Sequence, residues 1–106
     1  NRFFLELGVE NGLETNTTFL LSQNWKGIWF EGNLKYKDFI SKTFKQSISS
    51  NNLKVVFDYL NNRNIKKILM NNCDIEVPDL LSIDIGLSTF SVLRSIDFIK
   101  PRVIVV

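Results

Sequence analysis

The chain has 106 residues and a formal net charge of +2, with 44% hydrophobic residues, nine Phe and no His. This length predicts one domain or part of one, and the apolar content is sufficient for a hydrophobic core. So weak a charge gives no support for nucleic acid or an anionic membrane as a partner. No apolar stretch approaches the roughly 20 residues that span a bilayer, and the first residues show no signal-peptide pattern. The lack of His removes the commonest general base and the commonest zinc ligand, and no other cluster of metal ligands stands out.

Apolar runs and helical patterns alternate along the chain, with short connections between them. Five strands are predicted, at residues 3–8, 27–31, 53–57, 80–85 and 102–106. Helices are predicted over residues 16–24, 34–47, 63–72 and from 88 or 89 to 96. The polar segment 47–52 is expected to be a mobile loop. This alternation predicts an α/β fold, in which helices cover both faces of a parallel sheet and right-handed crossovers join the strands.

Each of the first three predicted helices has an apolar side that we expect to pack on the sheet. These sides consist of Phe19, Leu20 and Leu21, then Tyr36, Phe39, Ile40 and Phe44, and then Ile65, Ile68 and Leu69. The lysines of the second helix indicate a solvated face rather than a binding patch. Asn61 or Asn62 is expected to cap the third helix.

The turn from Glu6 to Gly12, ELGVENG, has the composition of a ligand-binding loop. A strand that leads through a Gly-bearing turn into a helix builds small-molecule pockets at the carboxyl edge of α/β sheets. A dinucleotide-binding turn has glycines at its first and third positions, but here Glu10 follows Gly8 where the second glycine would be. A carboxylate at that place would repel a pyrophosphate. Two acids and two glycines in one turn therefore favour a ligand with an ammonium or sulfonium group and no phosphate.

Two further acids lie at the ends of predicted strands. Glu31 ends the second strand, where an acid accepts hydrogen bonds from ribose hydroxyls in nucleotide-binding α/β folds; the alternative is a strand-end acid that faces water. Asp84 lies near the end of the fourth strand, which is expected to neighbour the first. It is a candidate for contact with ligand or substrate, and the structural alternatives are a helix cap or a paired core acid. Asp79 is expected to be solvated, and Asp58 is a weak candidate for an adenine contact.

The single Cys73 cannot form an internal disulfide, which favours a reducing compartment. We interpret it as a small hydrophobic residue rather than a nucleophile. The last predicted strand, Arg102 to Val106, is apolar after its first residue and has no terminating turn. An edge strand of this kind is an aggregation hazard in a finished protein. We therefore expect the native domain to continue, or this edge to be available to a second copy of the chain as a homodimer.

Three segments of the chain together resemble one known family. They are FFLELGVENGLETNTTFLLSQNWKGIWFEGN, PDLLSIDIG and KPRVIVV, and their order is that of the FkbM-like group of class I S-adenosylmethionine-dependent methyltransferases. The family's acid-Gly-Gly cofactor loop corresponds to Glu6, Gly8 and Gly12. Its second-strand segment corresponds to Trp25, Gly27, Ile28, Glu31 and Asn33. The chain departs from the family after Ile85, where an acidic residue usually precedes the glycine that here follows directly as Gly86.

This resemblance implies a Rossmann-like methyltransferase domain over residues 1–106, a three-layer α/β/α sandwich with a mostly parallel sheet. The chain would be its N-terminal part, strands one to five, and incomplete at the C-terminal end. The implied cofactor is S-adenosylmethionine. Its implied binding residues are Glu6, Gly8, Glu10, Gly12, Glu31, Asn33 and Asp84. Glu31 would bind the ribose, and Asp84 would lie near the reactive centre.

The leading hypothesis is methyl transfer from S-adenosylmethionine to a hydroxyl oxygen of a small molecule or sugar, in the cytoplasm. Such an enzyme mainly has to hold the acceptor and the methyl group at near-attack distance, and a base that removes the acceptor proton would help. Because the chain has no His, Asp84 is the candidate for this catalytic role. The alternatives are a cofactor-binding domain without catalysis and an NAD-linked oxidoreductase, which Glu10 disfavours.

Overall fold

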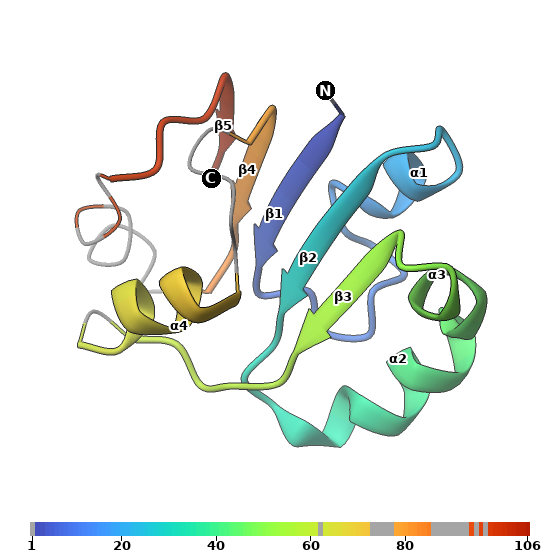
Figure 1. Ribbon diagram of the computed structural model, residues 1–106. Helices are drawn as coiled ribbons and strands as arrows, with labels where there is room; N and C mark the ends of the chain where they lie inside the picture. The colour runs from blue at the N-terminus through green and yellow to red at the C-terminus, as the bar shows by residue number, and fades with distance from the viewer. Residues whose placement is uncertain (1, 62, 73–77, 86–93, 95, 97) are drawn as a thin grey trace.

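A parallel sheet of five strands forms the centre of the protein (Figure 1). The computed structural model describes residues 2–61, 63–72, 78–85, 94, 96 and 98–106. The strands are β1 (Phe3–Leu7), β2 (Lys26–Phe30), β3 (Leu53–Val56), β4 (Leu80–Ile83) and β5 (Val103–Val105). They lie in the order β3-β2-β1-β4-β5, and every pairing is parallel. The five predicted strands and the contact between the first and fourth are confirmed, with strand ends that differ by at most two residues.

The helices are shorter than predicted. They are α1 (Thr18–Leu21), the 3-10 helix η1 (Leu34–Tyr36), α2 (Lys37–Thr43), α3 (Lys45–Ser49) and α4 (Ile65–Asn72). The predicted helix 34–47 is therefore three pieces. It breaks at Phe44, where the backbone leaves helical angles (φ −106, ψ 23) and the ring packs edge-on against Trp29 with centroids 4.8 Å apart. The predicted loop 47–52 is wrong in its first half, because α3 extends to Ser49.

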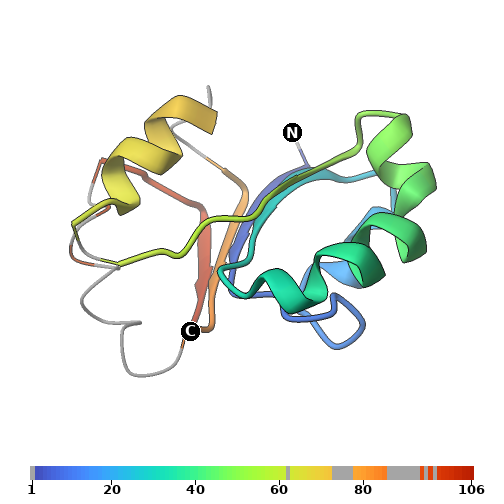
Figure 2. The same cartoon turned by 90° about the horizontal axis from the view of Figure 1, so that it is seen from below.

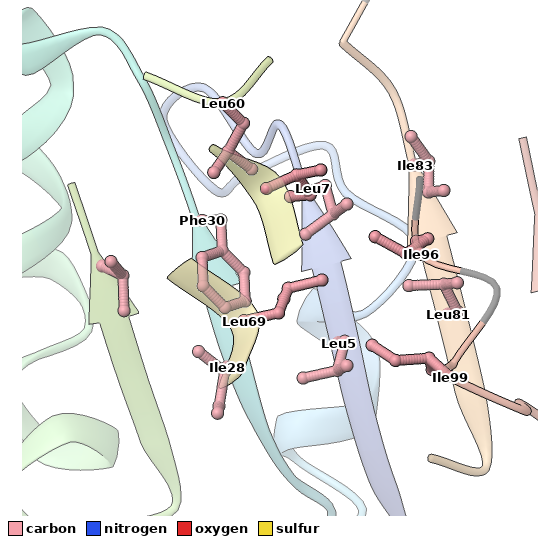
Figure 3. Packing of buried hydrophobic residues seen from close by; sticks show 12 residues of the cluster. Leu5, Leu7, Ile28, Phe30, Leu60, Leu69, Leu81, Ile83, Ile96 and Ile99 are labelled. Carbon is pink, nitrogen blue, oxygen red and sulfur yellow. The ribbon is translucent and has the colours of Figure 1, made fainter. Parts of the chain in front are cut away.

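Helices cover both faces of the sheet, as the sequence predicts (Figure 2). On one face, α1, α2 and α3 cover a cluster built on Phe4, Trp29, Ile40 and Leu53. On the other face, α4 packs on alternate residues of the strands, shown in Figure 3, with Leu69 fully buried. Asn61, a predicted cap, lies four residues before α4, and its side-chain oxygen accepts hydrogen bonds from the backbone N–H groups at residues 63 and 64 in the turn that leads into this helix. The predicted helix from 88 or 89 to 96, Cys73 and Gly86 lie largely or wholly outside the described residues.

Two of the predicted inward-facing aromatic residues lie at the surface. Phe19 is 68% exposed and Phe39 is 43% exposed. The physical reason is local: α1 is a single turn, and Leu20 and Leu21 already fill its contact with the sheet. On α2, Ile40 is the fully buried residue and takes the inward place.

β5 lies at one edge of the sheet that the described residues form. Its side chains are open to solvent, with Val103 54% and Ile104 47% exposed. Within the described ranges, no helix has both the length and the apolar character to cross a membrane.

Candidate functional site

The carboxyl ends of β1, β2, β3 and β4 meet at one edge of the sheet, and a cleft of about 730 Å³ opens there. Because parallel strands all end on the same side, their following loops supply the walls. The cleft is lined by Gly8, Glu10, Phe30, Glu31, Gly32, Asn33, Leu34, Tyr59, Leu60, Asp84 and Ile85. Five of the residues that the sequence analysis selected therefore share one cleft: Gly8, Glu10, Glu31, Asn33 and Asp84.

Gly8 forms the floor of this cleft, where no side chain would fit. Its φ of +85 lies in the left-handed region, and its N–H donates to the carbonyl of Phe30 at 2.8 Å. A Cβ atom at this position would lie 2.2 Å from the carbonyl oxygen of Asp84. The glycine thus allows the ends of β1 and β4 to approach each other, and it leaves backbone rather than side chain facing a ligand.

Glu31 is 7% exposed, and its carboxylate fastens the first loop to the end of β2. Oε1 accepts hydrogen bonds from the N–H of Val9 at 3.0 Å and of Glu10 at 2.7 Å. Oε2 accepts one from the N–H of Asn33 at 2.8 Å. A carboxylate offers about four acceptor positions, so one position on Oε2 remains. The predicted ribose-binding residue is therefore beside the first loop, and it has room for a single direct hydrogen bond from a ligand.

Glu10, Asn33 and Asp84 surround Glu31 with further polar groups. Glu10 has a φ of +52, an uncommon conformation for a residue with a side chain, and its carboxylate accepts a hydrogen bond from the hydroxyl of Tyr36 at 3.4 Å. Asn33 caps η1, where its side-chain oxygen accepts the N–H of Lys35 at 3.1 Å. Asp84 is exposed, directly beyond β4. Its backbone N–H donates to the carbonyl of Leu7 at 2.8 Å, which fixes the position of the residue at the end of β1.

A second hollow of about 410 Å³ adjoins the cleft and shares Gly8, Glu10 and Asp84 with it. Its other lining residues are Glu6, Val9, Asn11, Leu13, Glu14, Thr15 and Asn16, all from β1 or the loop that follows. Neither hollow has a Lys or Arg among the described residues that line it, whereas carboxylates occur in both. The described lining of both hollows therefore carries carboxylates and no cationic side chain, a composition that favours a cationic ligand over a phosphate.

Two predicted cofactor-binding residues take other places. Gly12 lines neither hollow; it packs beneath two aromatic rings, and a Cβ there would lie 2.6 Å from Trp29 and 2.8 Å from Phe44. Glu6 borders the second hollow but is 2% exposed, with its carboxylate bonded to protein groups. Glu6 points away from the cleft because even-numbered side chains of β1 face the α1 side of the sheet.

Sequence reasoning missed the apolar residues of the cleft. Leu34 and Tyr59 are 65% and 72% exposed although they are large, and they come from the segments after β2 and β3. Leu60 and Ile85 add further apolar surface. A signal was present, since Leu34, Tyr59 and Leu60 follow the ends of predicted strands by two or three residues, and Ile85 is the last residue of the fourth predicted strand. Asp58, the weak adenine candidate, is not part of the lining.

Asp79 lies at the opposite edge of the sheet, and its predicted solvation is wrong. Its side chain is 15% exposed, and its carboxylate accepts the N–H of Phe3 at 2.9 Å and pairs with Arg102 at 3.5 Å. The hydrogen bond from Phe3 is the main reason that the pKa of this carboxyl lies below its ordinary value, and the Arg102 charge contributes to the same shift. Over the described part of the chain, no three His, Cys, Asp or Glu residues are grouped as a metal site would need.

No protein-family model and no curated protein matches the sequence. Among solved structures, the fold is similar to that of precorrin-6y C5,15-methyltransferase from Geobacter metallireducens GS-15, with a TM-score of 0.65 and 16% sequence identity. The match covers 94% of this chain and 49% of that chain, so the present sequence spans about half the length of that methyltransferase. The likeness shows that the chain has a Rossmann-like α/β fold of the kind found in that enzyme.

Proposed function

We propose that this chain is the cofactor-binding part of an S-adenosylmethionine-dependent methyltransferase that acts on a hydroxyl group of a small molecule or sugar. The observation that supports this proposal is the composition of the cleft. Glu10, Glu31 and Asp84 are its charged residues, and no Lys or Arg lines its described part. A pyrophosphate would meet repulsion here, whereas S-adenosylmethionine has no phosphate and carries a sulfonium and an ammonium group.

The shape of the cleft also suits a nucleoside. Leu34 and Tyr59 lie on segments that follow neighbouring strands and offer exposed apolar surface for a purine base. Glu31 has one acceptor position for a ribose hydroxyl. The backbone at Gly8 lies open between the cleft and the second hollow, where the carboxylates of Glu10 and Asp84 would face a positive charge.

The cofactor would supply the chemistry, an activated methyl group, and the protein would supply position and charge. Asp84 borders both hollows and is exposed, so a hydroxyl acceptor beside it could give its proton to this carboxylate. The loop walls would hold the acceptor at near-attack distance. The fold likeness to an enzyme named as a methyltransferase is in keeping with this assignment, as is the sequence resemblance to the FkbM-like group.

The proposal can be tested by calorimetric titration of the chain with S-adenosylhomocysteine and, separately, with NAD. We expect S-adenosylhomocysteine to bind and NAD to bind far more weakly. Glu31→Ala should lower the affinity for S-adenosylhomocysteine by about 1–3 kcal/mol, roughly 5- to 150-fold, because a charged hydrogen-bond acceptor is lost. Asp38→Asn, a change of an exposed acid that lines neither hollow, is the matched control and should have no effect.

Preference for NAD would refute the methyltransferase assignment. Equal affinity of the wild type and Glu31→Ala would refute the role of Glu31. Tight binding without methyl transfer to any hydroxyl acceptor would instead identify a cofactor-binding domain without catalysis.

A further inference from the structure

The carboxylate of Glu6 is buried at the centre of a hydrogen-bond network beneath the first loop. Oε1 accepts hydrogen bonds from the backbone N–H of Thr17 at 3.2 Å and from its hydroxyl. Oε2 accepts the hydroxyl of Ser82 at 3.0 Å and the N–H of Asn16 at 3.3 Å. Four donors thus converge on one carboxylate, and this number matches its acceptor capacity.

The network extends to the neighbouring strands. The register of the sheet places Glu6 directly between Trp29 of β2 and Ser82 of β4. The indole N–H of Trp29 donates to the hydroxyl of Thr17 at 2.8 Å, and the side-chain amide of Asn16 donates to the hydroxyl of Ser82 at 2.9 Å. Every buried side-chain nitrogen or oxygen in the described part of the chain has a partner, so this polar cluster is fully satisfied.

Two buried carboxylates therefore hold the loop 8–17, one near each end. Glu31 holds the start through the N–H groups of Val9 and Glu10, and Glu6 holds the return through Asn16 and Thr17. The same loop supplies most of the lining of the second hollow. A carboxylate with all four acceptor positions engaged has none left for a ligand.

We propose that Glu6 is a positioning residue, which anchors the return of loop 8–17 and so places the cofactor-facing part of that loop, without touching the cofactor itself. That this part of the loop faces a cofactor rests on the function proposed above, whereas the anchoring of the loop by Glu6 does not. The charge matters because both carboxylate oxygens must accept. In Glu6→Gln one oxygen becomes an NH₂ group, which would face donors from Thr17 or from Asn16 and Ser82 and leave them unsatisfied.

The first test is amide hydrogen exchange, measured by NMR without any ligand. Glu6→Gln should speed exchange at Asn16 and Thr17 by at least about tenfold, because their N–H groups lose a charged acceptor. Exchange at Val9 and Glu10 should change less, and Glu31→Gln should give the reverse pattern. The indole N–H resonance of Trp29 should shift in Glu6→Gln, since its acceptor is the hydroxyl of Thr17.

A second pair of variants keeps the test informative if Glu6→Gln fails to fold. Thr17→Val removes the hydroxyl that links Glu6 to Trp29, whereas Thr17→Ser retains it. We expect Thr17→Val to speed exchange at Asn16 and to lower the affinity for S-adenosylhomocysteine. Thr17→Ser should keep both the exchange rate and the affinity at their wild-type values.

Unchanged exchange at Asn16 and Thr17 in Glu6→Gln would overturn the anchoring role. Loss of S-adenosylhomocysteine affinity with no change in loop exchange would also overturn it, because Glu6 would then contact the ligand directly. A wild-type chain that does not bind S-adenosylhomocysteine would refute the proposed function and leave the exchange result to decide the role of Glu6.

Discussion

Gly8→Ala is the substitution for which the structure makes the firmest prediction. The left-handed backbone at this position, φ +85, costs a residue with a side chain about 1–2 kcal/mol. The added Cβ would also lie 2.2 Å from the carbonyl oxygen and 2.9 Å from the carbonyl carbon of Asp84. These atoms are backbone, so relief requires β1 and β4 to separate at their ends, and overpacking of this kind costs about 1–3 kcal/mol.

Together these costs predict a loss of about 2–5 kcal/mol in the free energy of unfolding, a large part of the 5–15 kcal/mol typical of a domain. Urea unfolding followed by fluorescence, which reports on the two Trp residues, measures this loss. Gly32→Ala is the matched control. Gly32 has no positive φ, and its nearest contact to a built Cβ is 3.1 Å, so a loss of no more than about 1 kcal/mol is expected.

Equal stability of Gly8→Ala and Gly32→Ala would refute this reasoning, because it would show that the ends of β1 and β4 are not packed as closely as the structure has them. A Gly8→Ala chain that retains stability and also binds S-adenosylhomocysteine as the wild type does would remove Gly8 from the candidate site as well.

Three further predictions concern the core, the acid range and the cleft. Leu69→Ala should lower the free energy of unfolding by about 2–5 kcal/mol in urea titration, because Leu69 lies on α4 with its side chain fully buried against the sheet. Asp79 has a lowered pKa in the folded chain, mainly through the N–H of Phe3. The ionised carboxylate therefore stabilises the fold above about pH 4. This contribution to the free energy of unfolding is lost as the pH falls through the pKa of Asp79 in the folded chain. Asp79→Asn should thus flatten the fall of the melting temperature between about pH 5 and pH 3. Tyr59→Ala should weaken S-adenosylhomocysteine binding in calorimetry while stability stays within about 0.5 kcal/mol, since this side chain is 72% exposed.

The strands could be predicted from the sequence because their signal is local. Runs such as Phe3-Phe4-Leu5 and Gly27-Ile28-Trp29-Phe30 are apolar on both faces, as central parallel strands must be. The ends of the helices were harder to predict, because they depend on contacts between residues that are distant in sequence. The apolar spacing at Phe39, Ile40 and Phe44 is correct for one helix, but the contact of the Phe44 ring with Trp29, which bends the chain there, joins residues that are distant in sequence.

The candidate site shows the same division between local and distant information. The ends of the predicted strands place Glu10, Glu31 and Asp84 at the carboxyl edge of the sheet, and in the structure all three line one cleft. What an acid does there depends on which donors reach it. For Glu31, two of the three donors are N–H groups of a loop 21 and 22 residues earlier.

Glu6 shows how such a role could be recognised from sequence once a sheet order is assumed. It shares a face of β1 with Phe4, which belongs to the cluster under α1 and α2. An acid on a covered face must be hydrogen-bonded, and the order β2-β1-β4 makes Trp29 and Ser82 its neighbours. Two hydrogen-bonding side chains beside a buried acid, together with the Thr-rich segment that follows the loop, indicate an internal anchor. Glu10 and Asp84 lie beyond the ends of β1 and β4, so strand register gives neither of them a partner of this kind.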